Sequence, residues 1–137
     1  MNVAVVLLRY LSNYTDFNVL ERDPRVHLYY TNNTEELRKA DIIILPGSKS
    51  TLADLYELRR NGAAQAIVQA HRDGTTVLGI CGGFQLMGME VCDPDHIEGD
   101  IERLPGLSLL PVTTVMTGEK VTRRTAFRFL DHTDECE

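Results

Sequence analysis

The stretch Gly79-Ile80-Cys81-Gly82-Gly83-Phe84-Gln85 joins an expected strand to an expected helix through a cysteine framed by glycines. The β-branched and aliphatic run at 75–78 predicts a buried strand, and the helix is expected to begin at Gln85-Leu86-Met87. A turn of this kind forces its central residue into a strained backbone conformation, so the side chain stands clear above the sheet. The N-terminus of the following helix would also favour a thiolate. The pattern therefore predicts that Cys81 is a nucleophile rather than a small buried hydrophobic residue.

Short strands and helices alternate along the chain before this turn. Expected strands cover residues 3–8, 26–30, 42–45 and 76–80, and expected helices cover 34–39, 51–61 and 64–72. Residues 42–45 read Ile-Ile-Ile-Leu, which is typical of a central parallel strand that is buried on both faces. The alternation predicts a three-layer α/β fold, a mostly parallel sheet with helices on both faces. After a loop-rich segment at 91–111, we expect antiparallel strands at 112–116 and 121–130.

Three loops are expected to converge on one site. In a parallel α/β sheet, sites lie beyond the C-terminal ends of the strands, and the loops after Leu8, Leu45 and Ile80 follow such ends. A thiolate at Cys81 would attack a carbonyl carbon, and the resulting oxyanion needs hydrogen-bond donors. The backbone N–H of Gly82 is one candidate. The loop Pro46-Gly47-Ser48 offers a second, although taken alone Gly47 could equally be a turn glycine.

Size and composition indicate one ordinary globular domain. The chain has 137 residues, 43% of them hydrophobic, and a formal net charge of −6, which argues against nucleic acid and anionic membranes as partners. No apolar run approaches the roughly 20 residues of a membrane span, and no signal peptide is evident. Three cysteines at irregular spacing form neither a disulfide framework nor a zinc pattern, so no metal is expected. We expect a cytoplasmic protein.

Four segments carry a resemblance to a known family. Residues 79–85 resemble the nucleophile motif of class I (triad-type) glutamine amidotransferases, whose fold is flavodoxin-like. Leu45-Pro46-Gly47-Ser48-Lys49-Ser50-Thr51 resembles the oxyanion loop of one branch, the cobyric acid synthases. Arg9 and the segment 12–17 resemble that branch's loop after the first strand. Residues 107–112 resemble its Gly-Leu-Gly-Leu-Leu-Pro segment, with Ser108 in place of a glycine. The matches run in order from residue 1 to about residue 115.

The resemblance implies a reaction and a set of site residues. Cys81 would attack the side-chain amide of L-glutamine, form a glutamyl thioester and release ammonia. Gly47 and Gly82 would stabilise the oxyanion, and Gln85, Ser48 and Asn13 would bind the substrate. In this family the ammonia passes to a synthetase domain of the same parent chain, which uses ATP and Mg to amidate corrinoid carboxylates in cobalamin biosynthesis.

The synthetase domain has no counterpart in this sequence, because no glycine-rich loop ending in Gly-Lys-Ser or Gly-Lys-Thr occurs. Residues 1–137 are therefore expected to be a partial amidotransferase domain that needs no cofactor of its own.

The resemblance also implies a catalytic histidine that the sequence does not supply. The thiol needs a base that takes its proton and returns it to the leaving ammonia. The family carries this histidine in a late motif like Tyr-Glu-Ile-His-Met-Gly, which is absent. His27, His71 and His96 are interpreted as structural, surface or loop residues, and the neighbours of His132 do not match the motif. We therefore expect a C-terminally truncated domain that has a nucleophile and oxyanion donors but does not turn glutamine over.

Two other interpretations stay open. One is a DJ-1-like cysteine-elbow hydrolase; that class usually carries a glutamate on an early strand, and residues 3–8 and 26–30 contain none. The other is a non-catalytic α/β binding module that retains the turn as a relic. A relic predicts ordinary thiol reactivity, whereas a nucleophile predicts selective modification of Cys81 over Cys92 and Cys136.

Overall fold

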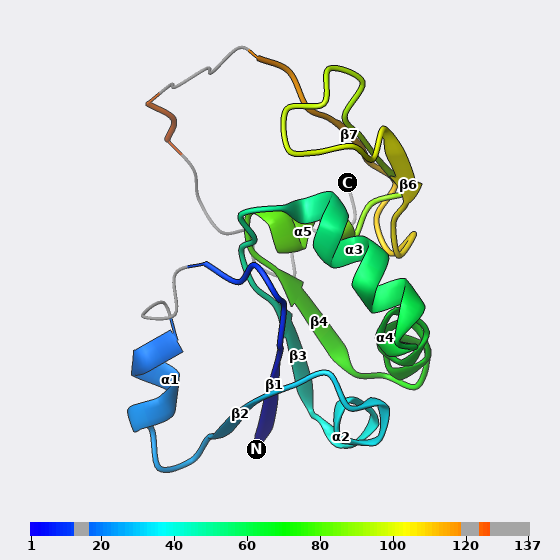
Figure 1. The fold of residues 1–137 in the computed structure, drawn as a ribbon. Coiled ribbons are helices and arrows are strands. Elements are labelled where there is room, and N and C mark those ends of the chain that lie inside the picture. Colours follow the sequence, from blue (N-terminus) through cyan, green and yellow to red (C-terminus); the bar gives the residue numbers. More distant parts are fainter. Residues whose placement is uncertain (13–16, 119–123, 127–137) are drawn as a thin grey trace, which may run out of the picture.

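A four-stranded parallel sheet forms the centre of the protein (Figure 1). The computed structural model describes residues 1–12, 17–118 and 124–126. The strands are β1 (Asn2–Val6), β2 (His27–Thr31), β3 (Ile42–Leu45) and β4 (Thr76–Gly79), in the order β2-β1-β3-β4. All three pairs are parallel. This is the flavodoxin-like strand order, and it confirms the predicted parallel sheet.

Helices cover both faces of the sheet, which confirms the three layers. One face packs against α2 (Thr34–Lys39), α3 (Thr51–Arg60), α4 (Ala63–Arg72) and α5 (Gly82–Leu86), and α1 (Asn18–Arg22) lies on the opposite side (Figure 1). Alternate residues of one strand point to opposite faces. Ala4 and Val6 accordingly join the first core, while Val3 and Val5 join a second core with Phe17. In the described part of the chain, none of the helices is long and apolar enough to cross a membrane.

Capping residues and glycines set the helix ends. The Asn33 side chain accepts hydrogen bonds from the backbone N–H groups of Glu35 (2.9 Å) and Glu36 (3.2 Å), which otherwise lack intrahelical partners. Between α3 and α4, Gly62 has φ 85°, a left-handed conformation that disfavours residues with a Cβ. Gly62 thereby lets α4 begin with only two residues between it and the end of α3.

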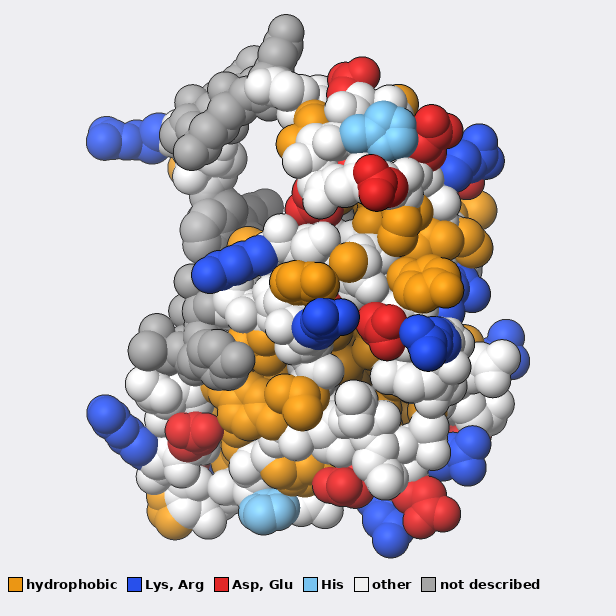
Figure 2. Space-filling model, viewed as in Figure 1, with side chains coloured by type: hydrophobic (Ala, Val, Ile, Leu, Met, Phe, Trp, Pro, Cys, Tyr) orange, Lys and Arg blue, Asp and Glu red, His pale blue; other side chains and the backbone are white. Residues whose placement is uncertain are grey.

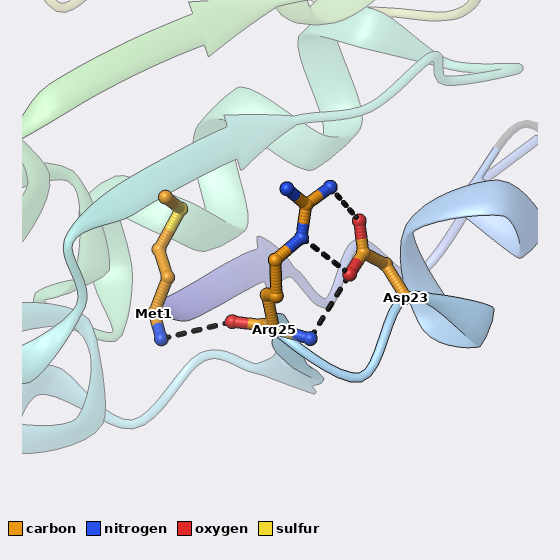
Figure 3. Close-up of polar contacts among 3 residues, drawn as sticks. All are labelled: Met1, Asp23 and Arg25. Atoms are coloured by element: carbon orange, nitrogen blue, oxygen red, sulfur yellow. Dashed lines mark hydrogen bonds and ion pairs between the residues drawn. The ribbon is translucent and has the colours of Figure 1, made fainter.

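The turn before β2 is fixed by the chain terminus and an ion pair (Figure 3). Asp23 accepts hydrogen bonds from the backbone N–H of Arg25 (2.9 Å) and from its Nε (3.0 Å) and Nη2 (2.8 Å). The terminal amine of Met1 donates to the carbonyl of Arg25 (3.1 Å). These contacts place the start of β2 beside the start of β1.

A second, smaller sheet follows α5 in the chain. Its strands are β5 (Glu90–Cys92), β6 (Arg103–Pro105) and β7 (Thr113–Val115), in the order β6-β5-β7. β5 and β6 are antiparallel, so antiparallel strands do occur near the C-terminus, but β6 and most of β5 lie in the segment that was expected to be loop-rich (91–111). The strand expected at 112–116 is β7, and it runs parallel to β5. The strand expected at 121–130 lies mostly outside the described residues, and residues 124–126 form no strand.

The strand before the cysteine turn is less buried than its apolar composition predicts. Thr76 is exposed and Leu78 is 50% exposed. The expectation of a buried strand is therefore wrong for β4. The reason is its position, because among the described residues β4 pairs only with β3 and lies at the edge of the sheet. In the view of Figure 2, hydrophobic side chains gather on the surface over the strands.

Candidate active site

Cys81 stands at the tip of the turn between β4 and α5. Its backbone has φ 50° and ψ −114°, a conformation that residues with a side chain rarely adopt, and its side chain is exposed. The flanking glycines are required by close packing: a Cβ at Gly83 would lie 1.9 Å from the carbonyl oxygen of Leu45, and a Cβ at Gly79 would lie 2.7 Å from the backbone N of Phe84. The strained, exposed cysteine has the local geometry of a nucleophile turn.

The loop after β3 lies directly against this turn. A Cβ at Gly47 would be 3.9 Å from the Cβ of Cys81, and a Cβ at Gly82 would be 3.1 Å from the backbone N of Ser48. Within the described residues, the N–H groups of Gly47 and Ser48 donate no hydrogen bond. Gly82 begins α5, so its N–H has no acceptor one turn earlier in the helix. Amide N–H groups without an acceptor among the described residues thus lie in the loop against the cysteine turn and at the start of α5.

The loop after β1 joins the loop after β3. The N–H of Ser12 donates to the carbonyl of Gly47 (3.0 Å), and the N–H of Lys49 donates to the carbonyl of Tyr10 (2.9 Å). Leu11 and Ser48 form an isolated antiparallel bridge between these bonds. The Oγ of Ser12 lies 2.8 Å from where a Cβ of Gly47 would be, so its hydroxyl borders the same space. Asn13, the other residue expected here, lies outside the described residues.

Gln85 points from α5 toward the start of α3. Its Oε1 accepts a hydrogen bond from the Oγ1 of Thr51 (3.4 Å), and the backbone N–H of Thr51 donates to Oε1 of Glu98 (3.0 Å). Glu98 is held by buried Asp93, which accepts from the N–H groups of Ile97 and Glu98 (both 2.8 Å). Burial raises the pKa of Glu98 and outweighs the backbone hydrogen bonds from α3, which lower this pKa. The small sheet thus supplies a carboxylate to the rim of the site.

Asp54 is a buried carboxylate behind the same loop. Asp54 is only 1% exposed, and its Oδ2 accepts a hydrogen bond from the Oγ of Ser48 (2.5 Å). Burial raises the pKa of Asp54, while the hydrogen bonds from Ser48 and from the backbone of Tyr10 lower it. Sequence reasoning missed Asp54 because an acidic residue in the first turn of a helix is favoured by the helix dipole and so carries no sign of a site. It missed Thr51 and Glu98 because their contacts join distant segments.

None of the described histidines hydrogen-bonds or forms an ion pair with Cys81. His27 begins β2, and His71 lies in the last turn of α4, shortly before β4 begins. Both therefore lie toward the end of the sheet where the strands begin, whereas the cysteine turn follows the end of β4. His96 pairs with Glu102 (3.3 Å) in the loop between β5 and β6, and His132 lies outside the described residues. The described ranges also contain no group of three or more His, Cys, Asp and Glu side chains that could hold a metal ion.

Comparisons with known proteins agree with this geometry. Residues 2–135 match the model of the CobB/CobQ-like glutamine amidotransferase domain. Cobyric acid synthase of Bacteroides fragilis is 79% identical over 137 residues, and that of Phocaeicola vulgatus is 70% identical over the same length. These alignments cover the whole of this chain and 28% of each relative. The chain therefore spans about 28% of the length of the curated relatives it matches.

A solved structure shows the same fold. A peptidase E-like protein from Listeria monocytogenes superposes with a TM-score of 0.66 at 19% sequence identity. The match covers 80% of this chain and 63% of that one. At this identity the likeness concerns the fold alone.

Proposed function

The chain belongs to the CobB/CobQ-like glutamine amidotransferase domain family, and we propose that it cleaves the side-chain amide of L-glutamine with Cys81 as the nucleophile. The observation that carries the proposal is the strained, exposed Cys81 at a glycine-framed turn, with the unused amide donors of the Gly47 loop against it. The 79% identity to a cobyric acid synthase supports the proposal that this chain is the glutaminase part of such an enzyme.

The reaction follows from the groups around the cysteine. The thiolate of Cys81 attacks the amide carbon, and the carbonyl oxygen becomes an oxyanion that accepts hydrogen bonds from the N–H groups of Gly47 and Gly82. The C–N bond then breaks, the nitrogen takes up a proton and leaves as ammonia, and a γ-glutamyl thioester remains. Water hydrolyses the thioester to glutamate and restores the thiol.

Gln85, Ser48 and Asn13 are proposed to hold the substrate. Gln85 and Ser48 border the turn, and the Ser48 hydroxyl already donates to Asp54, so Ser48 has its backbone N–H to offer to glutamine. None of the described histidines is assigned as the base that removes the thiol proton. For that reason, slow or absent turnover of glutamine by this chain alone stays a prediction.

The ammonia is proposed to serve a larger enzyme. By analogy with the relatives, a synthetase part of a longer parent protein would use ATP and Mg to activate corrinoid carboxylates, and the released ammonia would amidate them in cobalamin biosynthesis. Support for this step is the similarity to cobyric acid synthases, of which this chain spans about 28%. A cytoplasmic location remains an expectation from the sequence.

Covalent labelling tests the glutaminase proposal without requiring turnover. The probe is a chloromethyl ketone built on the glutamine skeleton, and the readout is intact mass followed by peptide mapping. We expect one label per chain, located on Cys81, and protection by millimolar L-glutamine but not by L-asparagine, whose amide lies one methylene too close to the backbone.

Two variants serve as matched controls. Cys81→Ser should abolish the labelling. Cys92→Ser should leave the labelling unchanged, because Cys92 lies in β5, away from the turn, and its thiol donates a hydrogen bond to Glu90 (2.9 Å). Equal labelling of Cys81 and Cys92 without protection by glutamine would refute the proposal. That result would favour a non-catalytic module with a relic turn.

A further inference from the structure

The buried carboxylate of Asp54 joins the two loops that border Cys81. A carboxylate removed from water must be compensated by hydrogen bonds. Asp54 receives one from the Oγ of Ser48 (2.5 Å), in the loop after β3. Both of its oxygens also lie 3.3 Å from the donating N–H of Tyr10, in the loop after β1. Asp54 therefore connects α3 to both loops at once.

Ser48 transmits this connection to the backbone of its own loop. Its Oγ donates to Asp54 and accepts from the N–H of Ser50 (3.0 Å), so the side chain is held at both its donor and its acceptor. A fixed Ser48 side chain restrains the two peptide units next to Ser48, and the first of them joins the carbonyl of Gly47 to the N–H of Ser48. The N–H of Gly47 belongs to the preceding peptide unit, one residue earlier in the same loop. Those N–H groups have no hydrogen-bond acceptor among the described residues, so this part of the loop is held by Asp54 through Ser48 and by the hydrogen bond from the N–H of Ser12 to the carbonyl of Gly47 (3.0 Å).

We propose that Asp54 is a positioning residue that, by holding Ser48, aims the amide donors of this loop at the substrate on Cys81, with the N–H of Gly47 toward the oxyanion and the N–H of Ser48 toward the bound glutamine. The inference rests on the proposed glutaminase function and adds a residue to it. Oxyanion stabilisation depends on donors that are in place before the charge develops, because reorienting them during the reaction costs energy. A side chain that touches no substrate can therefore affect the rate by holding such donors still.

Two reagents separate this role from a general structural one. Iodoacetamide alkylates a thiolate by displacing iodide, and no carbonyl oxygen becomes negative. An activated γ-ester of glutamate, the γ-p-nitrophenyl ester, acylates the thiolate through a tetrahedral oxyanion. The C–O bond then breaks, and p-nitrophenolate leaves as an anion without needing a proton. At about pH 9 an ordinary thiol, with a pKa near 8.5, is mostly ionised, so neither reaction depends on a catalytic base.

The variants are Asp54→Asn and the control Asp41→Asn, both made in the full 137-residue chain. In Asp54→Asn, one oxygen must serve both Ser48 and Tyr10, and it is a weaker acceptor than a carboxylate. Asp41 is an exposed carboxylate that accepts from the N–H of Asn2 (2.8 Å), at the start of β1 and away from the turn. We expect Asp54→Asn to slow acylation by about 10- to 100-fold, less than the loss when an oxyanion donor is removed outright. Alkylation should stay within about twofold, and Asp41→Asn should change neither rate.

Ser48→Ala and Ser48→Thr keep the test decisive if Asp54→Asn does not fold. Ser48→Ala leaves the carboxylate in place but removes the hydroxyl that it holds, so the same selective loss of acylation is expected. Ser48→Thr retains the hydroxyl and should restore acylation.

The possible failures are distinguishable. If wild-type Cys81 is not acylated by the γ-glutamyl ester at all, the proposed function fails. If wild type is acylated and the folded Asp54→Asn chain reacts equally fast, the inference about Asp54 fails while the function stands. A parallel fall of acylation and alkylation in the Asp54 and Ser48→Ala variants would also overturn the inference, because it indicates a purely structural role.

Discussion

Replacing Gly83 by alanine should destabilise the protein through a clash of two backbones. Gly83 is the second residue of α5, where it crosses the end of β3. A Cβ there would lie 1.9 Å from the carbonyl oxygen of Leu45 and 2.8 Å from that of Pro46. These are main-chain atoms at the start of the loop against Cys81, so they cannot move aside as the end of a flexible side chain could.

The expected magnitude follows from two opposing contributions. Alanine is favoured over glycine inside a helix by about 1 kcal/mol. Overpacking costs typically about 1–3 kcal/mol, and a contact this short with fixed atoms belongs at or above the upper end of that range. The net loss in the free energy of unfolding should therefore be about 2 kcal/mol or more. For a domain of this length that corresponds to a fall in Tm of roughly 6–10 °C.

Urea unfolding followed by circular dichroism measures this loss, with Gly99→Ala as the matched control. Gly99 is exposed, has no atom within 4 Å of the position of an added Cβ, and does not have a positive φ. Its replacement should change the free energy of unfolding by less than about 0.5 kcal/mol. If Gly83→Ala unfolds at the same urea concentration as wild type and Gly99→Ala, the tight crossing of α5 over β3 is refuted.

Three further changes test other parts of the structure. Asn33→Ala should lower the free energy of unfolding by about 1 kcal/mol because it removes the cap of α2, whereas Asn32→Ala, at an exposed position before the cap, should not. Arg59→Met should lower the free energy of unfolding by about 1–3 kcal/mol, since Arg59 donates to the carbonyls of Pro105 (2.8 Å) and buried Gly106 (2.7 Å). The control Arg60→Met removes only the exposed ion pair of Arg60 with Glu57 and should cost under about 1 kcal/mol. Equal losses in the two variants would contradict the stabilising role of the Arg59 hydrogen bonds. Burial raises the pKa of Glu98, so the folded state binds its proton more tightly than the unfolded state. The stability that Glu98 contributes is then present below its unfolded pKa of about 4.3 and falls as the pH rises through the folded pKa. Urea titrations from about pH 4 to 7 should thus show wild type losing stability relative to Glu98→Gln as the pH rises, and a wild type that instead gains stability relative to Glu98→Gln would show the sign to be wrong.

Much of the fold could be predicted from local patterns. The strands β1 to β4 and the helices α2 to α4 agree with the expected ranges to within about two residues, because hydrophobic periodicity, caps and glycines act over a few neighbours. No range was expected for α1, and α5 begins at Gly82, three residues before the expected start. The cysteine turn was predictable for the same reason, since glycines on both sides of Cys81 leave room for one particular crossing of strand and helix. The small sheet was not, because three-residue strands show no periodicity and β5 pairs with segments more than ten residues away.

The sequence by itself determined the cysteine turn, the loop that faces it and the family, because each is written in contiguous residues. Only the tertiary structure decided that β4 lies at an edge and that Asp54 holds Ser48 and Tyr10 together behind the loop after β3. The physical reason is that exposure and hydrogen bonding depend on what packs against a residue. Ser48, Tyr10 and Asp54 are brought together by the ends of two parallel strands and the start of a helix, an arrangement that no local pattern encodes.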